Sequence, residues 1–428
     1  MEINKPIKEN SYAIYGLGLS GNSVLRFLKK KKVKKIFTWD DEKKSKNLNI
    51  DTFKRHLNEV YDIVMSPGIN IKKTKFKSIL FKNKKKIITD LDLFYMQKLL
   101  IKSIMVTGTN GKSTTCKLIQ HVLRSNKLDA QLGGNIGKPI LDLKIKKNSI
   151  VIIEASSFQL FYLKFSKPTF AIILNITKDH LDWHGTLKNY RNAKFNIFYN
   201  QDKQNLALLG NQNHIKKFKS KFFQSKLVKV TAGTVGRNIK KHVTNKYLLS
   251  IPNLENVSFV YKLSTILKIK KKIILKAFNT FKGLPHRNEI FYHKHGLIFI
   301  NDSKATSFDA TKHALKNNKN IFWIVGGLPK LRDKFKLQNV KKNIVKSYII
   351  GQKINYFKKQ IGKVLVYESS LTIQNALRDI FKDLLLLKQK KATILLSPAA
   401  ASYDQFTSFV ERGNHFKNNA LKHVRKFL

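Results

Sequence analysis

The sequence predicts an α/β protein made of parallel sheets and divided into three domains. Short apolar runs alternate with amphipathic helical stretches along most of the chain, a pattern typical of parallel sheets covered by helices. Two glycine-rich loops, at 16–21 and 108–111, each follow an apolar run directly. With 428 residues, the chain is too long for one ordinary hydrophobic core. We expect domains at 1–95, 96–284 and 285–428; the first and third are Rossmann-like, and the central one is an ATP-binding domain built around a phosphate loop.

The first domain opens with a nucleotide-binding pattern. An apolar strand at 12–15 leads into the loop 16–21, GLGLSG, a helical run follows, and the next strand ends at Asp40. A G-x-G-x-x-G loop between strand and helix, with an acid about 20 residues further on, is typical of dinucleotide sites. Alone it is a weak signal, since it could hold NAD, hold the pyrophosphate of another nucleotide, or form a tight turn. A further strand at 62–65 ends in the turn 66–69.

The central domain begins with a phosphate-binding loop. The strand 104–106 runs into Gly108-Thr-Asn-Gly111 and then Lys112-Ser-Thr114, and we expect a helix over 115–125. Glycines let backbone N–H groups approach phosphates, the lysine reaches the terminal phosphates, and a following hydroxyl can hold Mg²⁺. The loop is shorter than the usual G-x-x-x-x-G-K-[ST] pattern, and a chance glycine turn before a helix is the alternative.

Two further strand ends in this domain carry ionisable side chains. The strand 149–153 is followed by Glu154, and an acid at the carboxyl end of a strand near a phosphate loop suits a Mg²⁺ ligand. The strand 170–174 runs into the polar cluster 175–184, which contains His180. An ordinary strand-end carboxylate and a structural histidine are the alternatives.

The rest of the central domain is less informative. Nothing local marks Lys194, and from 201 to about 251 the sequence predicts only short strands and lysine-rich loops. The run 253–256 then precedes a predicted helix that ends at about 269, and a second helix follows. Gly283-Leu-Pro285 then breaks the chain, and we place a domain boundary there.

Several strand ends in the third domain carry glycine or polar loops. The run 301–306, NDSKAT, follows a strand pair, and the strands 320–325, 347–350 and 392–396 end in Gly-Gly, Gly and Ser-Pro. In an open α/β sheet, the carboxyl edge of the strands is where ligands bind. We therefore expect a ligand site at this edge.

The composition is strongly basic, with a formal net charge of +57. The lysines are spread along the chain in runs such as 29–32 and 84–86, which indicates codon bias acting on solvated faces rather than a nucleic-acid site. We expect no specific nucleic-acid partner, although non-specific attraction to polyanions is compatible with this charge. No stretch reaches the ~18 apolar residues of a membrane span, the N-terminus lacks a secretory apolar core, and the single Cys116 suits a reducing compartment. We expect a cytoplasmic protein without membrane insertion.

Taken in order, these motifs resemble the Mur ligase family over nearly the whole chain. The short loop TGTNGKSTT is similar to the family's own phosphate loop, which accounts for its unusual spacing. The run SPAAASYDQFTSFVERG, at 397–413, most resembles the members that add D-glutamate, and GLGLSG with SPGI favours the same branch. The other matching motifs are GGNIG at 133–137, Glu154 with SSFQL, NIT-x-DH-x-D at 175–182, LPHR at 284–287 and NDSKATS at 301–307.

The resemblance implies an ATP-dependent ligase that adds D-glutamate to UDP-N-acetylmuramoyl-L-alanine through an acyl phosphate. Such an enzyme makes a peptidoglycan precursor and thereby serves cell-wall biogenesis, cell shape and cell division. The resemblance also implies one domain each for UDP, ATP and the amino acid, with Mg²⁺ at two sites. We expect a monomer.

Position by position, the resemblance assigns roles to residues in all three domains. The catalytic residues are Lys112, His180 and Lys194, and the metal ligands are Ser113, Glu154, His180 and Lys194, the last as a carbamate. The ATP site comprises Gly108, Thr109, Asn110, Gly111, Lys112, Ser113, Thr114, Asn253, Asn256, Arg287, Asp302 and Lys304. The UDP substrate is contacted by Leu19, Ser20, Asp40, Ser66, Gly68, Asn135, Ser156 and Gln159. D-glutamate is contacted by Thr306, Lys330, Ser402, Tyr403 and Phe409.

Two departures and two rival functions bear on this assignment. Pro252 stands where many relatives have a histidine, and Ala400 replaces a common cysteine. An NAD-dependent oxidoreductase would use the loop 16–21 but would leave the loop 107–114 unexplained. A phosphate-loop switch or nucleic-acid ATPase would explain that second loop and the charge, but not the run 397–413. ATP turnover that requires both a UDP-sugar and an amino acid separates the three functions.

Overall fold

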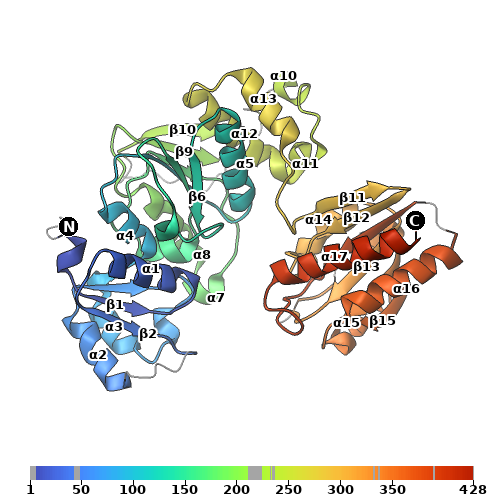
Figure 1. The fold of residues 1–428 in the computed structure, drawn as a ribbon, viewed down its shortest axis with the longest axis horizontal. Coiled ribbons are helices and arrows are strands. Elements are labelled where there is room, and N and C mark those ends of the chain that lie inside the picture. The colour runs from blue at the N-terminus through green and yellow to red at the C-terminus, as the bar shows by residue number, and fades with distance from the viewer. Residues whose placement is uncertain are drawn as a thin grey trace. The chain divides into compact units, whose positions relative to one another are not determined.

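A computed structural model describes residues 6–42, 49–210, 224–231, 233, 237–330, 333–335, 338–388 and 391–427. The strands form three sheets, and the chain divides into two compact units, Met1–Phe281 with the first two sheets and Lys282–Leu428 with the third (Figure 1). The expected α/β class with three sheet domains is confirmed. The expected domain boundary near residue 95, inside the first unit, stays a prediction.

The first sheet is fully parallel. Its strands are β1 (Tyr12–Tyr15), β2 (Ile36–Trp39), β3 (Asp62–Met65) and β4 (Ile87–Ile88), in the order β2-β1-β3-β4. Its helices are α1 (Leu19–Lys30), α2 (Ile50–Glu59), α3 (Lys77–Lys82) and α4 (Asp90–Met96), with short 3-10 turns η1 (Ile7–Glu9), η2 (Ile71–Lys73) and η3 (Lys84–Lys86). Alternate residues of β1 face opposite ways, so one side of the sheet packs on α1 and α4 and the other on α2 and α3.

The second sheet is also parallel and carries the phosphate loop. Its strands are β5 (Lys102–Thr107), β6 (Ala130–Gly134), β7 (Ile150–Glu154), β8 (Phe170–Ile173), β9 (Leu206–Gly210) and β10 (Lys226–Val230), in the order β10-β9-β8-β5-β7-β6. Because β7 and β8 flank β5, all three carboxyl ends meet at one place on the sheet edge.

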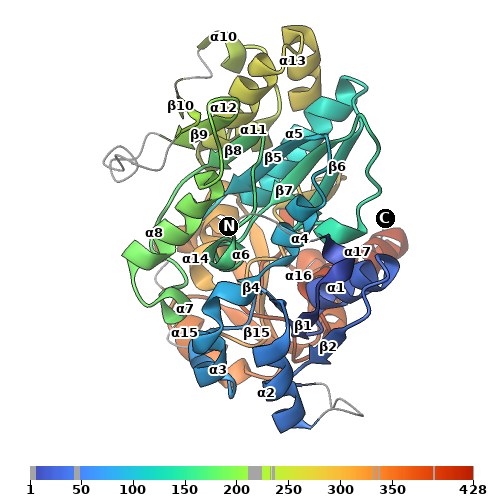
Figure 2. The same ribbon diagram turned by 90° about the vertical axis from the view of Figure 1, so that its left-hand side faces the viewer.

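Helices cover both faces of this sheet. They are α5 (Lys112–Ser125), α6 (Ser157–Tyr162), α7 (Leu181–His184), α8 (Leu187–Phe195), α10 (Arg237–Lys240), α11 (Lys246–Leu249), α12 (Ile251–Ile266) and α13 (Lys271–Thr280), with η4 (Ile140–Asp142) and η5 (Asn196–Phe198). Helices α5, α12 and α13 lie together on the face that buries Ile104 and Val106 (Figure 2). Helices α6 and α8 bury the opposite face, which contains Met105.

The third sheet forms the core of the second unit. Its strands are β11 (Glu289–Lys294), β12 (Leu297–Asn301), β13 (Ile321–Gly326), β14 (Ile344–Ile350), β15 (Tyr367–Leu371) and β16 (Ala392–Leu396), in the order β11-β12-β16-β13-β14-β15. The strands are parallel except β11, which pairs antiparallel with β12 at the edge. Helices α16 (Ile373–Leu386) and α17 (Phe409–Phe427) pack on one face, and α14 (Phe308–Asn317) and α15 (Ile354–Ile361) on the other, with η7 (Gln338–Asn343) before β14.

Three sequence-based expectations need correction. Helix α5 begins at Lys112 and not at 115, because Gly111 adopts a left-handed conformation at the N-cap and the next two polar residues are buried in the first turn. The stretch 237–249, expected as strands and loops, contains two short helices instead. Helix α12 begins at Ile251, so it includes the run 253–256 that was expected to precede it, and it ends at Ile266 rather than near 269. The expected loops over 211–223 lie outside the described residues.

Within the ranges that the structure describes, no helix is both long enough and apolar enough to cross a bilayer.

Candidate active site

The phosphate loop occupies the carboxyl end of β5, between Thr107 and the start of α5. Gly111 caps the helix with φ of 84°, a conformation that disfavours any side chain. A Cβ at this position would lie 2.1 Å from Oδ1 of Asn256, so α12 also requires a glycine here. The first N–H groups of a helix have no partner inside the helix, and together they favour bound anions. The loop therefore has the geometry of an anion site.

Two lysine amines lie against the backbone of this loop. Lys112 Nζ donates to the carbonyl oxygens of Gly108 and Thr109, both at 2.8 Å. Lys194 Nζ donates to the same Gly108 oxygen at 2.8 Å and lies 4.6 Å from the ring centre of Tyr190. Burial, reinforced by the Lys112 charge, holds the pKa of Lys194 well below its ordinary range. The structure thus brings two predicted catalytic residues together and favours a neutral amine at Lys194.

Glu154 ends β7 beside this loop and is almost fully buried. Its Oε1 accepts a hydrogen bond of 2.8 Å from Asn135 Nδ2, whereas its Oε2 is buried without a hydrogen-bond partner. A buried carboxylate oxygen without a donor is costly unless a cation occupies its free side. Ser113, in the first turn of α5, offers a hydroxyl oxygen. This oxygen donor set fits Mg²⁺ bound together with phosphate groups.

His180 lies between β8 and α7, in a left-handed conformation with φ of 51°. Its Nε2 lies 3.5 Å from Oδ2 of Asp179, and its ring makes an edge contact with Phe158. Partial burial lowers the pKa of His180, while Asp179 opposes that shift. Among the described residues, no group of three or more histidine, cysteine or acidic side chains could hold a metal. Besides His180, a second Mg²⁺ would therefore need oxygen ligands other than unmodified acidic side chains.

The two asparagines predicted for the nucleotide site lie on α12, next to the loop. Asn256 Nδ2 donates to Oδ1 of Asn253 at 3.0 Å, and Asn253 Nδ2 donates to the carbonyl oxygen of Tyr247 at 2.9 Å. Both side chains are buried, and Asn256 lies against Gly111. The structure therefore brings them to the phosphate loop despite the missing histidine of the family pattern.

Ser156 and Gln159 have well-defined local partners. Ser156 caps α6 in a capping box, in which its Oγ accepts from the Gln159 N–H and Gln159 Oε1 accepts from the Ser156 N–H. Gln159 Nε2 also donates to Oδ1 of Asp90, on α4, at 3.1 Å. Both residues thus support α6 and its contact with α4, and their predicted substrate contacts stay predictions.

The loop 16–21 of the first sheet is hydrogen-bonded to Asp40 and Ser66, which were predicted to contact the UDP substrate. Ser66 Oγ donates to the carbonyl oxygen of Gly16 at 2.8 Å, and the Leu17 N–H donates to Oδ2 of Asp40 at 2.5 Å. A Cβ at Gly21 would lie 1.8 Å from the Gly16 oxygen, so helix α1 approaches β1 closely only with glycine there. The side chains around this edge include Leu19, which is 85% exposed, together with Ser20 and the open position Gly68. The structure therefore brings the loop together with Asp40 and Ser66, and their nucleotide-binding role stays a prediction.

In the second unit, two residues predicted for the nucleotide site, Asp302 and Lys304, lie in the loop after β12, and the third, Arg287, precedes β11. Asp302 accepts hydrogen bonds from Ser397 Oγ at 2.7 Å and the Asn288 N–H at 3.1 Å. Burial raises the pKa of Asp302 to about 7. Lys304 Nζ lies 5.1 Å from the ring centre of Phe409, and Arg287 lies in the turn that precedes β11. The predicted residues Thr306, Ser402 and Phe409 belong to the same edge of the sheet.

At the same edge of the sheet, hydrogen bonds join the loop after β13 to the loop after β16. Leu328 and Ala401 exchange backbone hydrogen bonds of 3.0 and 2.9 Å, which links the segment that bears Lys330 to the segment that bears Ser402 and the exposed Tyr403. Arg412, 1% exposed, donates to the Ser303 side chain at 3.0 Å and to the carbonyl oxygens of Ser303 and Ala400 at 2.8 and 2.9 Å.

Arg412 had no role predicted from the sequence. Its place inside the run 397–413 was a visible signal, but nothing in the sequence showed which loops its guanidinium would join.

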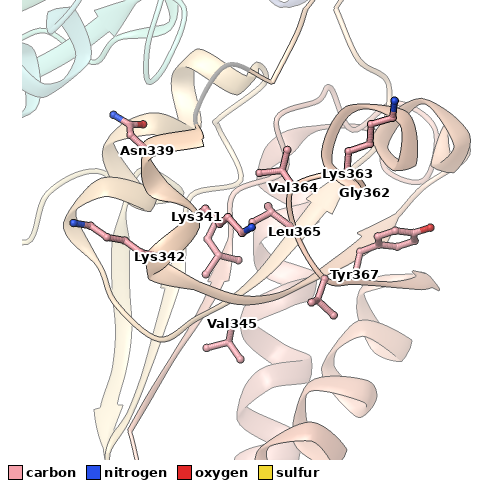
Figure 3. A pocket seen from close by; sticks show the side chains of 11 residues that line it. Asn339, Lys341, Lys342, Val345, Gly362, Lys363, Val364, Leu365 and Tyr367 are labelled. Atoms are coloured by element: carbon pink, nitrogen blue, oxygen red, sulfur yellow. The ribbon is translucent and has the colours of Figure 1, made fainter.

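A groove of about 1020 Å³ lies at the opposite edge of the third sheet, where β14 and β15 begin (Figure 3). Lys341, Lys342 and Lys363 surround apolar side chains there, among them Val345 and Leu365. The predicted amino-acid residues follow the carboxyl ends of the strands instead. This groove is therefore separate from the candidate site.

Comparison with known proteins identifies the class. The family model for the Mur ligase middle domain matches residues 106–274. The MurF ligase of Thermotoga maritima, solved in complex with ADP, superposes with a TM-score of 0.57 at 15% identity and covers 98% of this chain and 96% of its own. The UDP-N-acetylmuramate-alanine ligase MurC of the same organism gives a TM-score of 0.57 at 16% identity, covering 97% and 100%. These structures share the fold of a Mur ligase.

Curated relatives are similar to this chain over almost its whole length. The UDP-N-acetylmuramoylalanine--D-glutamate ligase of Rickettsia felis is 33% identical and covers 96% of this chain and 97% of its own. The enzyme of that name from Fusobacterium nucleatum is 34% identical, covering 96% and 98%. The chain therefore belongs to the Mur ligase family, on the branch of the UDP-N-acetylmuramoylalanine--D-glutamate ligases.

Proposed function

We propose that this chain uses ATP to join D-glutamate to UDP-N-acetylmuramoyl-L-alanine, a step of peptidoglycan synthesis. The observation that carries the proposal is the full-length likeness to ligases of that name, at 31–34% identity for several of them. The phosphate loop, whose backbone accepts hydrogen bonds from Lys112 and from the buried Lys194, supports the use of a nucleoside triphosphate.

The reaction has to overcome the poor reactivity of a carboxylate toward amines. An oxygen of the alanyl carboxylate attacks the terminal phosphorus of ATP, and ADP leaves. The amine of D-glutamate then attacks the carbonyl carbon of the acyl phosphate; the amide forms, the amine gives up a proton, and inorganic phosphate leaves. Both steps gather negative charge on phosphate oxygens. Lys112, His180 and the N–H groups at the start of α5 are the groups proposed to stabilise that charge.

Mg²⁺ is proposed to bind at Ser113 and Glu154, since the buried Oε2 of Glu154 has no hydrogen-bond donor. When bound, the ion would neutralise charge on the ATP phosphates. A second Mg²⁺ is proposed near His180 and Lys194. There the neutral form of the buried amine would add to CO₂ and release a proton to solvent, giving a carbamate whose anionic oxygen suits magnesium better than nitrogen does.

Two binding assignments complete the proposal. The loop 16–21, with Asp40 and Ser66, is proposed to hold the UDP group rather than NAD, because the relatives are named for a UDP substrate. The edge of the third sheet that carries Lys330, Ser402 and Tyr403 is proposed to hold D-glutamate.

The test is release of inorganic phosphate from ATP by the full-length chain. With UDP-N-acetylmuramoyl-L-alanine present, a panel of D- and L-amino acids should give turnover with D-glutamate and background values with the others. Turnover without the UDP-sugar, or with nucleic acid in its place, would refute the ligase assignment. Equal turnover with another amino acid would refute the proposed specificity alone.

A further inference from the structure

The side chain of Asn175 connects the phosphate loop to helix α12. Asn175 follows β8, and its Oδ1 accepts a hydrogen bond of 2.8 Å from the Asn110 N–H. Its Nδ2 donates to Oε2 of Glu255 at 3.0 Å and to the carbonyl oxygen of Asn110 at 3.3 Å. The backbone oxygen of Asn175 also accepts from the Thr109 N–H at 2.8 Å. Two consecutive residues of the loop are therefore held by one asparagine.

Only one orientation of this amide satisfies its neighbours. In the observed orientation, the oxygen faces the Asn110 N–H and the nitrogen faces an acidic oxygen. A flipped amide would set its N–H groups against the Asn110 N–H and its oxygen against the Glu255 carboxylate. Glu255 thus selects the orientation in which Asn175 can accept from the loop.

Glu255 belongs to the same helix turn as Asn256, which lies against Gly111 at the other end of the loop. Burial raises the pKa of Glu255, and the hydrogen bond from Asn175 opposes that shift. Helix α12 consequently contacts the loop twice, directly at Gly111 and through Asn175 at Asn110. The resemblance to the family assigns no role to Asn175 or Glu255.

We propose that Glu255 and Asn175 act as a positioning pair for the phosphate loop, in which the carboxylate orients the amide and the amide fixes the loop for nucleotide binding. The pair contributes through the loop and not through contact with substrate. This inference rests on the proposed use of ATP, and it deepens that function by naming what holds the loop in place.

The first experiment compares Glu255→Ala with Glu255→Gln in the full-length enzyme. Glutamine keeps an acceptor oxygen for Asn175, so E255Q should stay within about fivefold of wild type in KM for ATP, whereas E255A should raise it about tenfold or more. The matched control is Glu59→Ala, because that side chain is 67% exposed on α2. A purely structural role would lower kcat through loss of folded enzyme and would leave KM for ATP unchanged.

The second experiment exchanges the donor and acceptor between positions 175 and 255, so that the carboxylate is at 175 and the amide at 255. Asn175→Asp places two carboxylates in contact and should reduce kcat/KM for ATP about 100-fold. Adding Glu255→Gln to N175D restores a donor opposite the new carboxylate, so the double variant should recover at least about tenfold. Independent mutational effects would instead make the double variant no better than N175D.

Nucleotide affinity measured by calorimetric titration with ADP, together with thermal unfolding of each variant, separates the possible outcomes. Recovery of ADP affinity in N175D/E255Q would support the pair even if the enzyme proved not to ligate D-glutamate. No recovery in a double variant that unfolds at the wild-type temperature would overturn the pair, as would an unchanged KM for ATP in E255A.

Discussion

Arg412→Ala should destabilise the second unit and weaken its binding of D-glutamate. The guanidinium of Arg412 is 1% exposed and donates to two backbone carbonyl oxygens, those of Ser303 and Ala400, as well as to the Ser303 hydroxyl. These acceptors belong to the loops after β12 and β16. Truncation therefore removes the side chain that joins two loops of the proposed D-glutamate site.

The size of the effect follows from the acceptors left behind. Each buried carbonyl oxygen without a donor costs about 1–3 kcal/mol, so the two together cost about 2–6 kcal/mol of unfolding free energy in this unit. Burial lowers the pKa of Arg412 to about 10, yet the side chain stays charged at neutral pH. Arg412→Lys keeps the charge but cannot reproduce the planar set of donors, and an intermediate loss is expected.

The fluorescence of a single tryptophan can follow the unfolding of the second unit alone. The chain has three tryptophans, and Trp323 is fully buried in β13 of this unit. In a Trp39→Phe, Trp183→Phe background, urea unfolding followed at Trp323 reports on the second unit, with Arg425→Ala as the control, because Arg425 is an exposed residue of the same helix. The KM for D-glutamate is measured in parallel with the three tryptophans in place.

The expected result is a lower unfolding midpoint and a higher KM for D-glutamate in R412A, with smaller changes in R412K. An R412A variant that matches R425A in both quantities would show that Arg412 does not join the loops in solution. A stability loss without any change in KM would reject its effect on the amino-acid site.

Four other results are expected. Lys112→Ala should abolish phosphate release while the fold survives in circular dichroism, because it removes the loop cation at the transferring phosphate; activity within a few-fold of wild type would reject the phosphate-loop assignment. Lys194→Ala should lose most activity and regain part of it with acetate, and wild type should weaken when bicarbonate is removed; a fully active Lys194→Arg would exclude the carbamate. Calorimetric titration of the whole enzyme should show binding of the UDP-sugar and not of NADH, and the reverse pattern would overturn the role of the loop 16–21. The pKa of Asp302 is raised from 3.8 to about 7, so its protonated form stabilises the fold most below about pH 4, and this contribution is lost as pH rises through about 7. The stability advantage of wild type over Asp302→Asn should therefore shrink over that range in urea titrations, and a constant difference would contradict the shift.

Local pattern was enough to predict most strands and the loops that follow them, since alternating apolar runs and glycine turns are local features. The start of α5 was misplaced because Ser113 and Thr114 are polar yet buried, so the apolar period does not reach them. The contact between Gln159 and Asp90 could not be predicted either, because Asp90 lies on a helix of a different sheet and no spacing rule connects the two residues. The same is true of Asn175 and Glu255, which meet only after the strands are ordered.

Burial distinguishes one lysine of this chain that the sequence pattern does not mark. In a chain with a net charge of +57, lysine is so common on solvated faces that a lysine outside a recognisable motif carries little weight. Among the residues whose burial the structure describes, Lys194 is the only buried lysine. Taking a cationic amine out of water is unfavourable, and hydrogen bonds to the Gly108 carbonyl at 2.8 Å and to the Thr107 hydroxyl at 3.4 Å recover only part of that cost. The position therefore favours an uncharged or modified amine, which is why Lys194, unmarked in its local sequence, is the lysine whose chemistry most needs a direct test.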